Sequence, residues 1–174
     1  MSLLRPAVLV LVVSIAAAPS ARASGASPVQ ISLFAPVQIV PMDKSVSGLR
    51  LDLIYGKNAN VTGLDWGLVN HDTGDGNAWQ AGLVNMVEGK VTGWQDGGFN
   101  WTKGEFTGLQ SGIFNGTETM NGVAFGWINK TRNMHGLQLG LVNFTETMHG
   151  LQIGAGNIIQ KGKIPFLPIV NCSL

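Results

Sequence analysis

The sequence has few charged residues, few histidines and one cysteine. Charged residues make up 12% of the 174 residues and the formal net charge is +1, whereas a typical soluble domain has about 25% charged residues. No basic stripe is present that could meet a phosphate backbone, so nucleic-acid binding is not expected. The single cysteine, Cys172, excludes an intrachain disulfide framework and a multi-cysteine zinc site.

Long hydrophobic runs and helical periodicity are also lacking beyond the first 23 residues. Within that segment, Arg5 precedes an apolar run at residues 7–18, and Ala21-Arg22-Ala23 has the small-x-small pattern of a cleavage site. The run is short for a membrane-spanning helix. We therefore predict a secretory signal peptide at residues 1–23 and export to the periplasm, the outer membrane or the cell surface.

Glycine is abundant, with 24 residues, and most of the glycines belong to an internal repeat. The clearest copies are Gly-Leu-Gln-Leu-Gly-Leu-Val-Asn at 136–143 and Gly-Leu-Gln-Ile-Gly-Ala-Gly-Asn at 150–157. The last residue of the motif recurs every 14 or 15 residues: Asn70, Asn85, Asn100, Asn115, Asn129, Asn143, Asn157 and Asn171. Tyr55 stands one interval earlier, which predicts nine copies.

Side chains alternate within each copy with the period of a β-strand. One face carries leucine and tryptophan, as at Leu137, Leu139 and Leu141, and the other carries Gln138 and Gly140. The pattern predicts an all-β repeat fold, a parallel β-solenoid of about nine 14–15-residue coils with inward-pointing leucines. The asparagine would stand at a corner and bond its equivalent one coil away, and glycine would permit tight corners and close packing.

The predicted coils divide the chain into four parts. Residues 1–23 are the signal peptide, and residues 24–47 are a linker and N-terminal cap that holds at best an edge strand. Residues 48–163 form the β repeat array, and residues 164–174 form an atypical last repeat that serves as the C-terminal cap.

One copy of the repeat departs from the motif. Asp96, Gly97 and Gly98 stand where the other copies carry predicted core residues, which indicates a local bulge or kink.

An antiparallel β-meander or an outer-membrane β-barrel is the alternative fold. Strands of nine or ten residues with short turns would suit a membrane span. The copies show no odd–even alternation, however, and the glutamine face also carries apolar residues such as Phe99 and Phe114. Pro165 and Pro168 are awkward in a closing strand.

The repeat resembles a known family. The string at 136–143, together with Gly-Leu-Arg-Leu-Asp-Leu-Ile-Tyr-Gly at 48–56 and Phe-Leu-Pro-Ile-Val-Asn at 166–171, is similar to the bacterial surface-repeat family with GLQLGLVN-type repeats found in spirochaetes and other envelope-bearing bacteria. The resemblance covers residues 28–174. It implies export and placement at the cell surface, and it implies no catalytic activity, so no functional residue is carried over.

Candidate sites are scarce, and a structural interpretation is favoured for each. His135 and His149 share a phase and would stack about 5 Å apart, but we interpret them as exposed neutral side chains rather than metal ligands. Residues 72–77, Asp-Thr-Gly-Asp-Gly-Asn, suggest a calcium loop but lack its later glutamate, so a plain turn is favoured. Glu118 and Glu146 are interpreted as solvated turn residues.

Three further sets of residues are interpreted structurally. Cys172 is expected to be a small buried residue. Trp101 falls outside the core phase that the other tryptophans share, and it is a candidate surface contact. Asparagine sequons follow from the repeat itself and are weak evidence of glycosylation; they begin at Asn60, Asn100, Asn115, Asn129, Asn143 and Asn171.

The sequence as a whole favours an exported cell-envelope repeat protein that acts as a structural or interaction scaffold. No catalytic, cofactor-binding or metal-ligating residue is predicted, and no cofactor. The expected partner is a protein, a glycan or a second copy of the chain, and membrane association is possible. A small outer-membrane β-barrel, serving as anchor or pore, is the alternative function.

Overall fold

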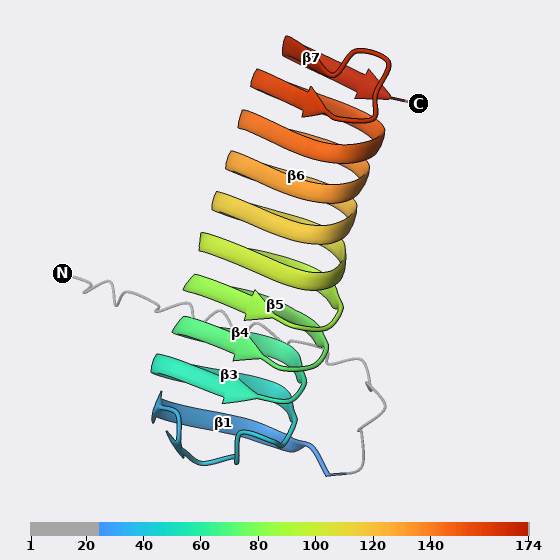
Figure 1. The fold of residues 1–174 in the computed structure, drawn as a ribbon. Helices are drawn as coiled ribbons and strands as arrows, with labels where there is room; N and C mark the ends of the chain where they lie inside the picture. The colour runs from blue at the N-terminus through green and yellow to red at the C-terminus, as the bar shows by residue number, and fades with distance from the viewer. Residues whose placement is uncertain (1–24, 174) are drawn as a thin grey trace, which may run out of the picture.

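Successive copies of the repeat wind in the same direction, each lying against the next, and build an elongated stack (Figure 1). The computed structural model describes residues 25–173, so the predicted signal peptide lies outside the described residues. The described residues form a seven-stranded sheet in the order β2-β1-β3-β4-β5-β6-β7. The strands are β1 (Ser27–Phe34), β2 (Val37–Gln38), β3 (Val46–Asn58), β4 (Val61–Asp72), β5 (Gly76–Val87), β6 (Val91–Ile159) and β7 (Phe166–Ser173).

The parallel pairing confirms the predicted β-solenoid. β1, β3, β4, β5 and β6 pair in parallel, and Leu64 lies opposite Trp79, which lies opposite Trp94 one coil further on. Strand β6 is one ribbon of 69 residues that continues the same winding. The antiparallel alternative, whether meander or barrel, is therefore wrong for the repeat array.

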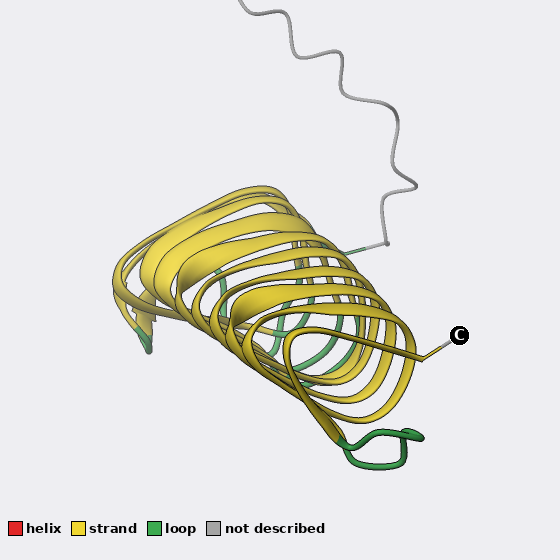
Figure 2. Ribbon diagram, turned by 90° about the horizontal axis from the view of Figure 1, so that it is seen from above, coloured by secondary structure: helices red, strands yellow, loops and turns green. Residues whose placement is uncertain are grey.

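The two ends of the array depart from the predicted nine regular copies. At the beginning, the register shifts between Asp52 and Tyr55, so that Tyr55 lies opposite Val69 and Gly56 lies opposite Asn70. At the end, the chain reverses after β6 and β7 pairs with it in antiparallel, with Asn171 opposite Gln152. Figure 2 shows this reversal as a loop beside the C-terminus. The ninth copy is thus a reversed edge strand rather than a coil.

The predicted orientation of the side chains is inverted. Gln138 and Asn143 are fully buried, whereas Leu139 is only partly buried and Leu141 is 57% exposed. Side chains alternate along the strand as predicted, but glutamine and asparagine face inward and the leucines face outward. The physical reason is that identical amides stacked at the spacing of strands satisfy one another, which removes the usual cost of burying them.

Asparagine forms the longer of the two amide ladders. From Asn70 to Asn143, each Nδ2 donates to Oδ1 of the asparagine one coil further on, over 2.8–2.9 Å. The same amide of Asn115 also donates to the carbonyl oxygen of Phe125 at 2.9 Å, and its equivalents do likewise. The predicted asparagine ladder is therefore confirmed.

Glutamine forms a second, interrupted ladder. Gln95 donates to Gln80 at 2.7 Å, and Gln110 donates to Gln95 at 2.8 Å. Buried Ala124 occupies the next place and breaks the series. Beyond Ala124, the side-chain amide of Gln138 donates a hydrogen bond to the hydroxyl oxygen of Thr131 at 3.1 Å. The interior is therefore mainly polar along two lines.

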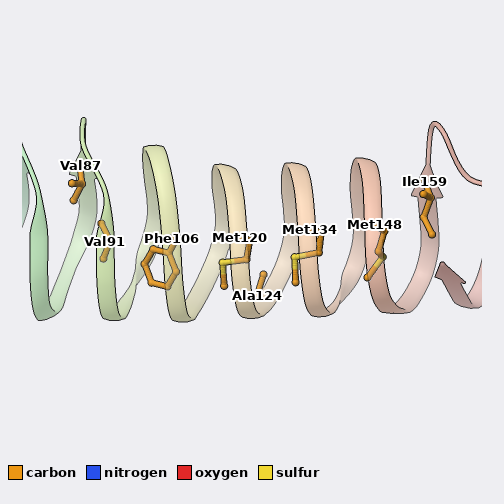
Figure 3. Packing of buried hydrophobic residues seen from close by; sticks show 8 residues of the cluster. All are labelled: Val87, Val91, Phe106, Met120, Ala124, Met134, Met148 and Ile159. Carbon is orange, nitrogen blue, oxygen red and sulfur yellow. The ribbon is translucent and has the colours of Figure 1, made fainter. Parts of the chain in front are cut away.

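The apolar core is a narrow column of buried side chains that runs from coil to coil inside the solenoid (Figure 3). Its members include apolar residues that stand two positions before the first glycine of a copy, among them Phe106, Met120 and Met134, all fully buried. The main cluster consists of Val87, Val91, Phe106, Met120, Ala124, Met134, Met148 and Ile159. A smaller cluster of Val40, Val46 and Val61 lies toward the N-terminal end.

Glycine is required where the coils approach most closely. Gly122 has a φ of 145°, and a Cβ there would lie 2.1 Å from the carbonyl oxygen of Gly108. Beside the asparagine ladder, a Cβ at Gly126 would lie 2.6 Å from Nδ2 of Asn115. The predicted role of glycine in corners and close packing is confirmed at both places.

The prediction of a bulge at Asp96, Gly97 and Gly98, in the copy that departs from the motif, is wrong. Asp96 and Gly97 lie opposite Ala81 and Gly82 in an unbroken parallel register. The small side chains there do not disturb the core because this segment borders the exterior of the coil, where Asp96 is exposed. The departure from the motif changes the surface and leaves the winding intact.

Candidate binding face

The outward side of the Gly-φ-Gln-φ-Gly-φ segment forms one broad surface, which we call the apolar face. It consists of three columns of side chains that run along the stack of coils. The first is Leu64, Trp79, Trp94, Leu109, Val123, Leu137 and Leu151; the second is Trp66, Ala81, Asp96, Ser111, Phe125, Leu139 and Ile153; the third is Leu68, Leu83, Gly98, Ile113, Trp127, Leu141 and Ala155.

Large apolar side chains on this face are exposed to an unusual degree. Leu83 is 62% exposed, Trp127 is 63% exposed and Phe125 is 57% exposed. Each coil places the same phase beside the last, so the apolar side chains follow one another along each column, except near Asp96, Gly98 and Ser111. Contiguous apolar surface of this kind marks interaction sites in soluble proteins more often than scattered leucines do.

Aromatic rings stack between neighbouring coils on the outside of the solenoid. The rings of Trp79 and Trp94 are parallel, with centroids 5.4 Å apart. Around the next corner, Phe99 stacks on Phe114 at 4.9 Å, and Trp101 stacks on Phe114 at 6.1 Å. Trp101, predicted as a surface contact, is a half-buried member of this second stack.

The turn side of the coils is charged instead of apolar. Arg132 lies between Glu118 and Glu146 and forms an ion pair with each, and Lys161 contacts Glu146 at 3.3 Å. Hydrogen bonding from Lys161 and Arg132 lowers the pKa of Glu146 below its ordinary value, with burial opposing. Glu118 and Glu146 are thus partly exposed, as predicted, and ion-paired between coils.

His135 and His149 stack as predicted. Their rings are nearly parallel, with centroids 5.7 Å apart, and both side chains are exposed. Within residues 25–173, no group of three or more histidine, cysteine, aspartate or glutamate side chains is arranged to hold a metal ion.

The suspected calcium loop separates its two carboxylates. Asp72 is buried inside the coil, whereas Asp75 is exposed in the turn and accepts a hydrogen bond from the backbone N–H of Lys90 at 2.8 Å. The segment therefore behaves as a turn that bonds to the next coil.

The sequence interpretation missed a buried ionic cluster near the N-terminal end, formed by Arg50, Asp52, Asp65 and Asp72. All four residues are essentially inaccessible. Arg50 bonds both carboxylate oxygens of Asp65 at 2.6 Å, contacts Asp72 at 2.7 Å and contacts Asp52 at 3.1 Å. Arg50 and Asp65 occupy the glutamine phase, so charged residues in an amide column were the available signal.

The cluster holds three carboxyl groups against one guanidinium group. Burial raises the pKa of Asp52 to about 6, with Arg50 opposing. Burial also raises the pKa of Asp72 to about 8, again with Arg50 opposing. Burial acts to lower the pKa of Arg50, but the carboxylates of Asp72 and Asp65 outweigh it and leave the value raised. The cluster ties neighbouring coils together, and the carboxyl groups of Asp52 and Asp72 bind protons more tightly than free carboxylates do.

Cys172 and the sequon asparagines differ in how accessible their side chains are to solvent. Cys172 is exposed, so the prediction of a buried thiol is wrong, because β7 reverses direction and the residue lies on an edge strand. Among the sequon asparagines, Asn100, Asn115, Asn129 and Asn143 are buried in the ladder, which leaves their amides inaccessible in the folded protein.

Comparison with known proteins identifies no relative. No protein-family model, curated protein or solved structure matches the chain. In the described part of the chain, no helix has the length and apolar character needed to cross a membrane.

Proposed function

We propose that the chain is an exported protein of the bacterial cell envelope that acts as a non-catalytic interaction scaffold. The apolar face is the observation that supports this function best. It presents large exposed side chains on a backbone whose coils are fixed by amide ladders and continuous strand pairing. Repeat proteins of this kind offer an extended, rigid surface rather than an enclosed site.

The signal-peptide pattern at residues 1–23 and the surface-repeat resemblance support the proposed location. An anchor or pore built as an antiparallel barrel does not fit the parallel winding of the coils. The scaffold therefore attaches to the envelope through its apolar face, with the charged turns directed away from that contact.

Fractionation of cells that express the full-length chain tests this function. Wild-type protein should lose its signal segment and sediment with the cell envelope. Leu83→Glu combined with Leu141→Glu should shift most of it to the soluble fraction, because both side chains lie on the apolar face and are more than half exposed.

Asn77→Glu combined with Thr107→Glu is the matched control, because it adds the same two negative charges. Both positions are exposed and lie outside the three columns, so this variant should sediment as the wild type does. An unprocessed chain in the cytosol would contradict export. Equal envelope retention of the two double variants would contradict the role of the apolar face.

A further inference from the structure

A hollow interrupts the apolar face at the copy that departs from the motif. Gly98 stands between Leu83 and Ile113 in the third column, and Asp96 and Ser111 follow Ala81 in the second, so that this part of the face leaves a space of about 1140 Å³. Large apolar side chains bound it on the remaining sides: Trp94, Leu109, Ile113, Phe125, Trp127 and Leu141. Its volume is slightly above the range of ordinary small-molecule sites, which is about 300 to 1,000 Å³.

The hollow holds one charged group. Among the described residues of the three columns, Asp96 is the single charged side chain. Trp94 donates its indole N–H to the Ser111 hydroxyl at 3.0 Å, and that hydroxyl donates to Oδ1 of Asp96 at 2.5 Å. This relay orients the carboxylate beside the apolar walls. Within residues 25–173, no lysine, arginine or histidine forms an ion pair with Asp96.

The charge restricts what can cover the hollow. Removing a carboxylate from water without a cation is costly. A second copy of the apolar face brings no lysine, arginine or histidine within its described columns, so self-pairing through this face would bury Asp96 unpaired. A ligand with an apolar body and a cationic group satisfies both the walls and the carboxylate, and tryptophan faces also attract cations.

We propose that this hollow binds a small amphipathic ammonium ligand. Its cationic head lies against Asp96, and its apolar body packs on the side chains of Trp127, Phe125 and Ile113. This site requires neither export nor envelope attachment, so a test of ligand binding is independent of a test of the scaffold function.

Titration of the purified full-length chain tests the site. The probes are dodecyltrimethylammonium, dodecyl sulfate and dodecyl maltoside, each below its critical micelle concentration and followed by tryptophan fluorescence and calorimetry. The ammonium probe should bind saturably and about tenfold more tightly than the sulfate. Asp96→Asn should remove that preference and leave the affinity for the maltoside unchanged.

Asp43→Asn is the matched charge control, because Asp43 is exposed in a loop and pairs only with neighbouring Lys44 among the described residues. This variant should bind all three probes as the wild type does. Equal affinity of the wild type for the ammonium and sulfate probes would overturn the proposal. An unchanged ammonium affinity in Asp96→Asn would also overturn it.

Filling the hollow gives a second, independent arm. Gly98→Leu and Ser111→Phe each place a residue found elsewhere in the same column, and circular dichroism checks that the sheet persists. Both variants should lose saturable binding of all three probes. Wild-type affinity in both variants would place the binding elsewhere. Binding of a lysine-containing apolar peptide without any binding of the alkylammonium would assign the hollow to a protein partner and overturn the proposal.

Discussion

Met134 and Leu141 lie seven residues apart in one coil but on opposite sides of its wall, and alanine at each position should have very different effects. Met134 is fully buried in the apolar core, whereas Leu141 is 57% exposed. Truncating a buried methionine to alanine costs about 2–5 kcal/mol. Because Met120 and Met148 belong to the same cluster and are flexible enough to fill part of the space, we expect about 3 kcal/mol for Met134→Ala.

Leu141→Ala should cost much less. Complete burial of a leucine contributes about 1.5–3 kcal/mol, and less than half of this side chain is buried, so we expect a loss of about 1 kcal/mol. Urea unfolding followed by far-ultraviolet circular dichroism measures both variants. Repeat arrays unfold as coupled neighbours, and placing both changes in one coil makes the comparison direct. A larger loss for Leu141→Ala than for Met134→Ala would refute the inverted orientation.

Three other outcomes follow from the structure. Asn143→Ala removes a ladder amide and should lower the free energy of unfolding by about 2 kcal/mol, whereas exposed Asn77→Ala should change it by less than about 0.5 kcal/mol in the same urea assay. Because the folded state raises the pKa of Asp52 to about 6 from 3.8, its contribution to stability is present at pH 4 and is lost as the pH rises through 6. A Tm series from pH 4 to 8 should fall for the wild type and fall less for Asp52→Asn, by an amount equivalent to at most about 3 kcal/mol; identical slopes would contradict the burial of this carboxyl. Gly122→Ala should prevent folding or cost more than about 3 kcal/mol, whereas Gly156→Ala, whose Cβ would meet nothing nearer than 3.8 Å, should be neutral by thermal melting.

The repeat period was sufficient to predict the winding of the coils. Asparagines 14 or 15 residues apart predicted a ladder, and the ladder is present from Asn70 to Asn157. The same pattern could not show which side of the strand faces inward. The rule that leucine is buried and glutamine exposed holds for isolated side chains, and it fails at Gln138 because a stack of identical amides pairs with itself.

The ends of the array were not predictable from the repeat alone. Tyr55 stands at the expected interval in the sequence, but one extra residue between Asp52 and Tyr55 shifts its register against β4. Asn171 also stands at the expected interval, although its strand, β7, runs antiparallel to β6. An interval in sequence does not report strand direction. The ionic cluster of Arg50 with its three aspartates was not predicted, because Arg50 and Asp65 stand in the column that later coils fill with glutamine, and that column was expected to face outward.

Thiol labelling tests the inverted orientation most directly. In a Cys172→Ser background, which removes the exposed native thiol, single cysteines replace Met134, Met148, Leu141 or Ile153. The cysteines at 141 and 153 should react with a maleimide at rates near those of a free thiol, and those at 134 and 148 should be protected until urea unfolds the chain. Protection at 141 and 153 with rapid labelling at 134 and 148 would contradict the inverted solenoid.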